Sequence, residues 1–293
     1  MSSLPQSVTV SPGRGGLPRV RVAGPAASGE IYLNGAHVTS WRPDGQGDVL
    51  WMSAASGYSP GQPLRGGIPL CFPWFGAHAA DPAAPAHGFA RRTAWDLLGA
   101  EEDGDDMRVR FGLHDSAATR AGAWPHRFEA TCTVTIGPWL SVTLDVVNRD
   151  DRDVVVEEAL HTYLSVGDVR EARVTGLEGA WYIDKLAAPE LVAQDGPIRF
   201  TAETDRVYLG TRATALVEDP SRARAVTVAK SGSASTVVWN PWAAKAAAMP
   251  DFGDDEWTGM LCVETGNVGV DAVRLAPGEG HQMTAHVGLA PLA

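Results

Sequence analysis

The chain has few cysteines. Cys71, Cys132 and Cys262 are its three, they lie far apart, and they form no C-x-x-C pair. This number and spacing exclude a disulfide framework, and because each thiol lies in an apolar run we expect reduced cysteines in the core of a cytosolic protein. A catalytic cysteine stays open as a minor alternative, although no activating pattern surrounds any of the three.

Long apolar runs are also missing. The chain contains no stretch of about 18 apolar residues, the length that a membrane-spanning helix needs, and its opening, MSSLPQSVTVSPGRGG, lacks the apolar core of a secretion signal. We therefore expect a cytoplasmic protein without a membrane segment.

Positive charge is scarce. The 24 lysines and arginines face 35 aspartates and glutamates, which gives a net charge of -11. Nucleic-acid phosphates need a basic surface, so this balance argues against a nucleic-acid partner. An anionic small molecule remains compatible, because salt screens charges over about 8 Å and two local arginines can outweigh a distant acidic surface.

The signatures of several enzyme classes are absent. The eight histidines include no H-E-x-x-H and no close Cys/His set, so we expect no metal site. The chain has no Walker A motif, no G-x-G-x-x-G after a strand and no G-x-S-x-G, which argues against a nucleotide cofactor and a serine hydrolase. We expect an activity that needs no cofactor.

Glycine and proline, in contrast, are abundant. The 32 glycines and 20 prolines favour many short strands joined by turns. Only Ser116–Ala123 and Trp242–Met249 can form short helices. We predict an all-β fold, a single large β-sandwich over residues 30–293, preceded by a loosely ordered lead-in over residues 1–29 with one strand at residues 19–22.

The segment LRGGIPLCFPWFG, residues 64–76, combines a cation with a rigid aromatic stretch. Arg65 precedes the pair Gly66–Gly67, which can take strained backbone angles and allow a ligand to approach closely. Pro69 and Pro73 exclude a helix. The segment indicates a pocket that holds an anionic or polar ligand, and a buried loop with a surface arginine is the alternative.

The segment DVVVEEALHTYLSV predicts a strand over residues 154–166 with a polar row. With a period of two, Glu157, His161, Tyr163 and Ser165 share one face. Buried polar groups without partners cost about 1–3 kcal/mol each, so a cleft would explain such a row. An ordinary solvent-facing side is the alternative.

The segment GMLCVETGNV, residues 259–268, ends an apolar strand on a carboxylate. Glu264 is followed directly by a turn, so we expect it to be rigidly held and partly desolvated, which raises a carboxylate's pKa and makes it a better base. A residue that only caps the turn is the alternative. Ten tryptophans fit a sugar site, where sugar faces stack on rings, but they also fill cores well.

Together these stretches resemble the hexose-6-phosphate mutarotases (glucose-6-phosphate 1-epimerases), a branch of the aldose 1-epimerase-like proteins. The matching segments occur in the family's order and span most of the chain from about residue 30. They are RGGIPLCFPWFG (65–76), HGFAR (87–91) with Trp95, HTY (161–163), TVVWNPW (236–242) and LCVETG (261–266).

The resemblance implies a galactose-mutarotase-like supersandwich, a monomer, a small-molecule hexose phosphate as substrate, and a set of site residues. It implies His161 as general acid and Glu264 as general base. The substrate-binding residues that it implies are Arg65 and Arg91, which hold the phosphate, Asp184, which contacts the sugar, and His87, which lines the pocket. Three positions depart from the pattern: Ala86 stands where some members have Gln, and Thr265 and Asn267 stand where some have Pro and His.

The expected reaction is anomerisation by ring opening. A base removes the proton of the C1 hydroxyl and an acid protonates the ring oxygen, from opposite sides of the ring, before rotation and reclosure. Three alternatives stay open: an epimerase for unphosphorylated aldoses, a sugar-binding protein without activity, and a glycoside hydrolase that would need a second carboxylate such as Asp184.

Overall fold

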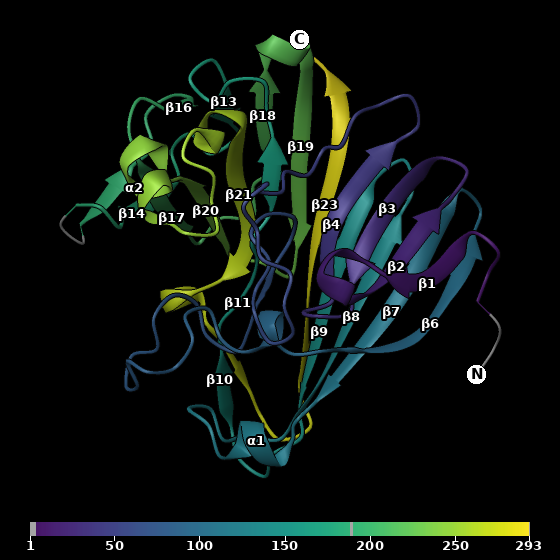
Figure 1. Ribbon diagram of the computed structural model, residues 1–293. Coiled ribbons are helices and arrows are strands. Elements are labelled where there is room, and N and C mark those ends of the chain that lie inside the picture. The colour runs from purple at the N-terminus through teal and green to yellow at the C-terminus, as the bar shows by residue number, and fades with distance from the viewer. Residues whose placement is uncertain (1–3, 188–189, 293) are drawn as a thin grey trace.

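Strands build nearly all of the protein (Figure 1). The computed structural model describes residues 4–187 and 190–292. In that part of the chain the α-helices are two, α1 (Ala117–Arg120) and α2 (Trp242–Ala248), and both lie where the sequence predicts a short helix. Neither has the length and apolar character needed to cross a bilayer. The all-β prediction is confirmed.

The largest sheet has nine strands, and its hydrophobic pattern follows the rule of alternation. In β8 and β9 every second residue is buried, as a strand with one face on a core requires. Its order in space is β16 (Ile198–Arg199), β13 (Arg173–Thr175), β18 (Ala215–Asp219), β19 (Arg224–Ser231), β23 (Gly280–Pro291), β9 (Leu140–Asn148), β8 (Phe128–Ile136), β7 (Asp106–His114) and β6 (Asp96–Asp103).

The second large sheet has eight strands and buries its middle on both faces. All residues of β20 and β21 are buried. One face joins the core that it shares with the nine-stranded sheet, where Val238 and Val263 lie in one cluster with Val217 and Val226. Its order is β15 (Leu191–Ala193), β14 (Trp181–Asp184), β17 (Thr204–Leu209), β20 (Ser235–Asn240), β21 (Met260–Asn267), β11 (Glu158–Leu160) and β5 (Leu70–Cys71), and β12 (Tyr163–Ser165) also pairs with β21.

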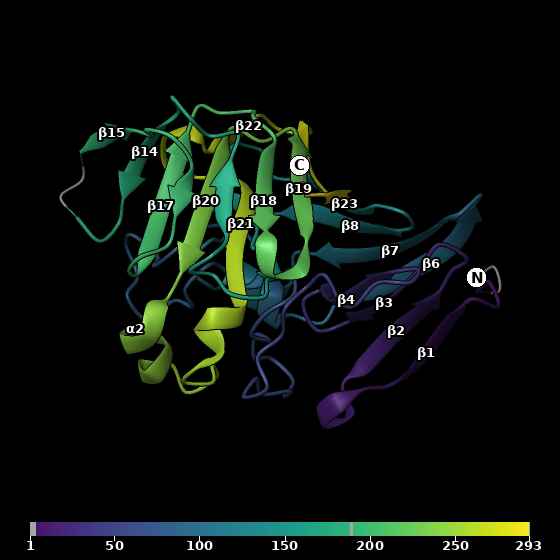
Figure 2. The same ribbon diagram turned by 90° about the horizontal axis from the view of Figure 1, so that it is seen from above.

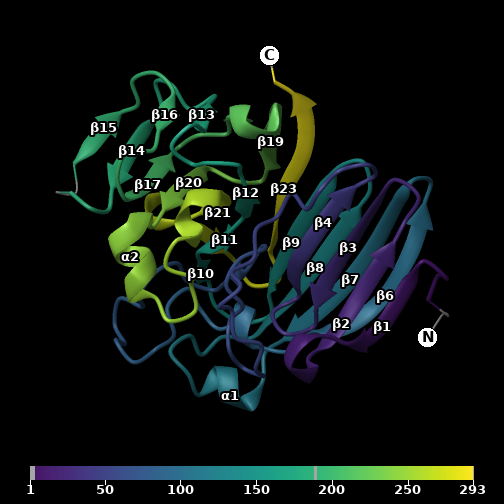
Figure 3. The same ribbon diagram turned by 45° about the horizontal axis from the view of Figure 1, so that its top comes forward.

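A four-stranded sheet covers the β6–β9 half of the nine-stranded sheet (Figure 3). At the contact Gly29 lies against Ile136, and the Trp41 indole donates to the Gly137 carbonyl. Seen from above, this sheet lies to one side of β17, β20 and β21 (Figure 2). Its strands are β1 (Val8–Pro12), β2 (Pro18–Ala23), β3 (Ala27–Tyr32) and β4 (His37–Pro43).

The amino-terminal segment therefore differs from the loosely ordered lead-in expected over residues 1–29. Residues 8–12 and 18–23 are paired strands, and Val8, Val20 and Val22 are buried in the main core. The prolines and glycines that suggested looseness lie at the strand ends and in the turn η1 (Arg14–Gly16), where they do not interrupt the pairing.

The single strand predicted over residues 154–166 is divided in three. Its first part, β10 (Val154–Val156), pairs with β22 (Val273–Leu275) in a separate small sheet, whereas β11 and β12 join β21. Leu50 and Met52 form isolated bridges with Leu164 and Gly66. The remaining elements are four short 3-10 turns: η2 (Ala90–Arg92), η3 (Pro220–Arg222), η4 (Glu256–Gly259) and η5 (Gly269–Asp271).

Asn240 provides a test of how the end of β20 is fixed. Its amide donates to the Trp257 and Met260 carbonyls and accepts from the Trp242 backbone, all while fully buried. We expect Asn240→Ala to lower the free energy of unfolding by about 1–3 kcal/mol, because the two carbonyls lose their partner. Denaturant unfolding measures the change. Gln46→Ala, in an exposed turn, is the control and should change it by less than about 0.5 kcal/mol; equal effects would contradict the anchoring role.

Candidate active site

Antiparallel pairing brings His161 and Glu264 together from positions about a hundred residues apart in the chain. Leu160 pairs with Thr265 and Tyr163 with Cys262, so the register places His161 directly opposite Glu264, with both side chains on one face. His161 Nε2 lies 3.3 Å from Glu264 Oε1. The side chains are 9% and 1% exposed. The two groups are therefore in contact side by side, and not across a ring-wide gap as expected.

An aromatic cluster surrounds the pair. The His161 imidazole stacks on the Tyr163 ring with centroids 4.7 Å apart and planes at 9°. The Trp239 indole meets both rings edge-on at 6.0 Å. His161 Nδ1 and Glu264 Oε2 have no hydrogen-bond partner among the described residues. These two atoms are the uncommitted polar groups at the pair.

Burial shifts the pKa values of the pair in opposite directions. It raises the pKa of the Glu264 carboxyl well above its ordinary 4.5, and the nearby Asp205 adds to the rise. Burial lowers the pKa of His161 well below its ordinary 6.5, and His87, Arg91 and Arg65 lower it further. Both groups therefore favour their neutral forms in the free protein.

Arg65 reaches the site but is already paired. Its guanidinium donates to the Tyr163 hydroxyl at 3.0 Å and to both carboxylate oxygens of Asp251 at 3.2 Å. The pair Gly66–Gly67 takes positive φ angles of 112° and 62°. A Cβ on Gly66 would lie 2.4 Å from the Trp51 carbonyl oxygen, and one on Gly67 would lie 2.2 Å from that of Val38. The glycines therefore make room for neighbouring backbone and not for a ligand.

The HGFAR segment packs against the aromatic stretch and positions a second cation. Gly88 forms a bridge with Phe72, and a Cβ on it would lie 1.9 Å from the Phe72 carbonyl oxygen. The Arg91 guanidinium donates to the Ala86 carbonyl, while its buried Nε has no partner among the described residues. The His87 ring lies 5.9 Å from that of His161, and burial lowers its pKa to about 3. The structure thus brings Arg65, His87 and Arg91 to the His161–Glu264 pair.

Asp184, in contrast, lies on the other face of the sheet. Antiparallel register aligns Glu264 with Val237, Val207 and Ile183. It aligns Asp184 with Arg206, Val238 and Val263, whose side chains point away from Glu264 because successive residues alternate. The register therefore does not bring Asp184 to the face that carries the His161–Glu264 pair.

Two neighbouring residues occupy the face that Asp184 was expected to reach. Asp205 is in register with Trp239, and burial raises the pKa of its carboxyl while Lys185 opposes the rise. The Lys185 ammonium lies 5.4 Å from the centre of the Phe75 ring and makes no ion pair within the described ranges. The alternation of side chains along a strand could have identified both residues from the sequence. Asp205 shares a face with Val207 and Leu209, and Lys185 lies on the face opposite to Asp184 because it follows it directly.

The rest of the predicted polar row does not join the pair. Glu157 accepts backbone N–H groups from Phe75 and Gly269, and so ties two loops together. The Ser165 hydroxyl and carbonyl accept from Arg222. Three positions depart from the resemblance. Ala86 contributes the carbonyl bonded to Arg91, Thr265 is buried, and Asn267 donates to Glu158 on the inner side of the sheet.

The cysteines are core residues, as the sequence predicts. All three are buried and free, and burial raises the pKa of Cys71 and Cys132 to about 12. Thiolates are therefore disfavoured at both positions. No three His, Cys, Asp or Glu side chains gather as metal ligands in residues 4–187 and 190–292.

Known proteins are similar to this chain in sequence and in the arrangement of their strands. The profile of the family described as aldose 1-epimerase matches residues 18–287. The chain is 38% identical over 242 residues to a Salmonella typhimurium protein named "Putative glucose-6-phosphate 1-epimerase", covering 82% of this chain and 80% of the relative. A protein of the same name from Cenchrus ciliaris is 38% identical over 262 residues, with 85% and 78% covered.

Solved structures agree. The crystal structure of a "putative mutarotase (YeaD)" from Salmonella typhimurium superposes with a TM-score of 0.91 at 32% identity, covering 99% of this chain and 96% of that one. A galactose 1-epimerase from Lactobacillus acidophilus has a TM-score of 0.75 at 13% identity, with 99% of this chain and 100% of that one covered, and shows the shared fold alone. With most of its length matched by the profile and by relatives above 30% identity, the chain belongs to the aldose 1-epimerase family.

Proposed function

We propose that the protein interconverts the α and β anomers of a hexose 6-phosphate, with His161 and Glu264 as the acid–base pair. The observation that carries this proposal is the 3.3 Å contact between His161 Nε2 and Glu264 Oε1, in a buried aromatic site bordered by cations. The relatives named for glucose 6-phosphate support the choice of substrate.

Adjacent groups suit this reaction better than groups on opposite sides of the ring. The hydroxyl that loses a proton and the ring oxygen that gains one are both bonded to C1 of the sugar. An acid and a base that serve these two oxygens must therefore lie close together. Glu264 removes the proton from the C1 hydroxyl while His161 protonates the ring oxygen, the C1–O5 bond breaks to give the open-chain aldehyde, and reclosure reverses these roles.

The pair needs one proton in all, wherever that proton resides. A neutral imidazole beside a carboxylic acid and an imidazolium beside a carboxylate have the same total charge and differ only by proton transfer across the contact. The free site favours the neutral form because burial penalises both charges. Bound sugar hydroxyls can supply hydrogen bonds to the charged form, which the uncommitted Glu264 Oε2 and His161 Nδ1 allow.

Three cations border the site and can hold the phosphate. Arg65 is neutralised by Asp251, whereas Arg91 and Lys185 have no carboxylate within 4.0 Å in the described part of the chain. A phosphate dianion would supply the missing counter-charge, and each charge-assisted hydrogen bond contributes about 1.5–3 kcal/mol. Asp205, on the same face, is placed to accept from a sugar hydroxyl, and Trp239 can pack against the ring.

Removal of the base tests the chemistry. We expect Glu264→Gln to lower kcat by about 10²- to 10⁴-fold, the usual range for a general base. Anomer-exchange NMR of glucose 6-phosphate measures the rate. The melting temperature should not fall, because the amide removes a buried group that is costly to ionise. An unchanged rate would reject this role for Glu264.

The cations are tested by selectivity between two sugars. We expect Arg65→Ala, Arg91→Ala and Lys185→Ala each to lower kcat/KM for glucose 6-phosphate at least about tenfold more than for glucose, since only the phosphate loses a charged partner. Arg206→Ala is the control, because Arg206 lies in register with Asp184 on the opposite face. Equal losses for both sugars would mean that the substituted residue does not bind phosphate, and a preference for glucose in the wild type would favour an epimerase of unphosphorylated aldoses.

The pH profile follows from the shifted pKa values. The pair gains a second proton only below the lowered pKa of His161, and loses its last one only above the raised pKa of Glu264. We therefore expect kcat/KM for glucose to be flat through pH 6.5, with losses well to either side. Glucose is the substrate here because a phosphate monoester itself titrates near pH 6. An inflection at the ordinary histidine value would show that His161 is not desolvated in the working enzyme.

A further inference from the structure

A cavity lined by several basic residues lies away from the His161–Glu264 pair. It has a volume of about 580 Å³, within the roughly 300–1,000 Å³ range of small-molecule sites. It lies between the β19–β20 hairpin, the end of β21 and the start of β23. Arg212, Lys230 and His281 line it together with Asn267 and residues 231–234, and no carboxylate is among its lining residues. Three basic side chains therefore converge where the protein supplies no acid on the wall.

Lys230 is fixed in position but makes no ion pair with any residue that the structure describes. Its ammonium donates to the Ser235 carbonyl and the Thr236 hydroxyl, each at 2.8 Å, which leaves one N–H uncommitted. Burial lowers its pKa to about 7, although Asp271 opposes this. One oxygen of the Asp271 carboxylate, Oδ2, accepts hydrogen bonds from the Gly210 backbone and the Ser235 hydroxyl. An anion in the cavity would stabilise the protonated lysine.

His281 contributes a second donor that is held from behind. Its Nε2 lies 2.8 Å from the Gly232 carbonyl and 3.2 Å from the buried Glu158 carboxylate. The hydrogen bond to Glu158 raises the pKa of His281. In the protonated ring, Nε2–H serves these oxygens and Nδ1–H remains available, since Nδ1 has no partner in the described ranges. Glu158 thus favours the cation without occupying the cavity.

Arg212 completes the set. It is exposed, and within residues 4–187 and 190–292 its guanidinium makes neither an ion pair nor a hydrogen bond. Its five N–H groups are therefore free to donate. A planar guanidinium beside an ammonium and an imidazolium offers the donors that a phosphate dianion accepts.

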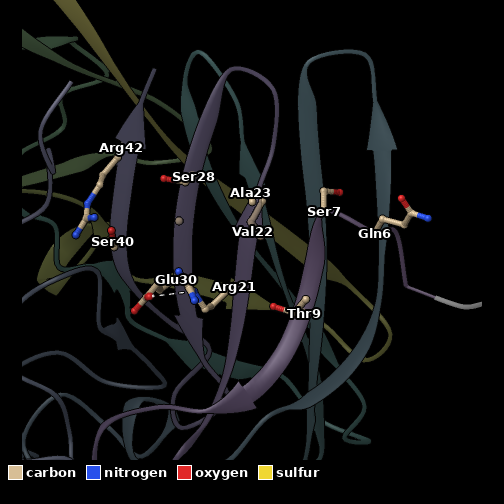
Figure 4. Close-up of a pocket in the computed structure, with 11 residues that line it drawn as sticks. Gln6, Ser7, Thr9, Arg21, Val22, Ala23, Ser28, Glu30, Ser40 and Arg42 are labelled. Carbon is tan, nitrogen blue, oxygen red and sulfur yellow. Dashed lines mark ion pairs between the residues drawn. The ribbon is translucent and has the colours of Figure 1, made fainter. Parts of the chain in front are cut away.

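Another arginine-lined cavity shows what a neutralised site looks like. On the outer face of the four-stranded sheet, Arg21 and Arg42 border a cavity of about 270 Å³ (Figure 4). There Arg21 lies 3.5 Å from Glu30, and Arg42 lies 3.0 Å from Asp48. Each cation already has its carboxylate. The cavity at Lys230 differs because Arg212 and Lys230 make no ion pair among the described residues, and only His281 is paired, with Glu158.

We propose that the cavity lined by Arg212, Lys230 and His281 binds the phosphate group of a phosphate monoester, as a second site distinct from the His161–Glu264 pair. Its volume exceeds the roughly 30 Å³ share of one water molecule many times over, so it has room for more than a bare phosphate. The site adjoins the catalytic strands, because Asn267 follows Glu264 by three residues on β21 and pairs with Glu158, three residues before His161. A ligand bound in this cavity would therefore lie next to the two strands β11 and β21 that position the catalytic pair.

NMR of the His281 ring in the full chain tests the proposal, because it reports on this cavity and not on the catalytic pair. The resonances are assigned with His281→Gln. We expect inorganic phosphate or glucose 6-phosphate to shift them saturably, and Arg212→Gln and Lys230→Met each to raise the midpoint about tenfold or more. Arg21→Gln, from the neutralised cavity, should leave it unchanged. Shifts with both ligands mean that the phosphate group alone is enough for binding. Shifts with glucose 6-phosphate only mean that the cavity also contacts the sugar.

Three results would overturn the proposal: no shift at His281 with either phosphate compound, an equal shift with glucose, or an unchanged midpoint in Arg212→Gln. Arg212 is exposed, so we expect the Arg212→Gln variant to fold normally. A calorimetric titration near neutral pH gives independent evidence. Since burial holds the pKa of Lys230 at about 7, phosphate binding should take up protons, and this uptake should disappear in Lys230→Met.

Discussion

The contact between a buried imidazole and a buried carboxyl determines most of what is distinctive in this structure. A carboxyl at 1% exposure is costly to ionise, and here its neighbour is a histidine that is also nearly enclosed. The surrounding sheet makes the contact possible: β21 is buried along its whole length and has β20 on one side and β11 and β12 on the other. Because both neighbours pair in register, neither side chain can withdraw to solvent. The fold thus enforces the shifted pKa values on which acid–base chemistry depends.

The sequence predicts the parts of this arrangement that local pattern controls. Alternation identifies the face shared by His161 and Tyr163, and the apolar strand before a turn identifies Glu264. In the amino-terminal part of the four-stranded sheet the sequence predicts a strand at residues 19–22 but not the order of the chain around it. The turns there contain the prolines and glycines that usually mark irregular chain, and pairing between strands decides whether such segments are ordered. Local composition carries no information about that pairing.

Asp184 shows the other limit. A one-residue change of phase along a strand moves a side chain to the opposite face of a sheet. The resemblance selects the acidic residue of WYIDKL, but the register of β14 with β17 and β20 puts Lys185 and Asp205 on the site face. Only pairing across four strands decides between these positions, so the sequence could indicate an acid near the sugar without identifying it. Arg65 differs from Arg91 and Lys185 in having a carboxylate partner, Asp251, although all three are cations at one site.

Net charge and local charge are separate properties in this protein. The whole chain has a charge of -11, yet among the described residues Arg212 and Lys230 line one cavity without an ion pair, while Arg21 and Arg42 at another are neutralised. Over the roughly 8 Å that physiological salt leaves unscreened, an anion responds to the nearest groups and not to the total. An acidic protein can therefore bind acidic ligands, provided that its folding leaves certain guanidinium and ammonium groups without carboxylates of their own. The positions of unpaired cations are thus a better guide to ligand chemistry here than the overall charge.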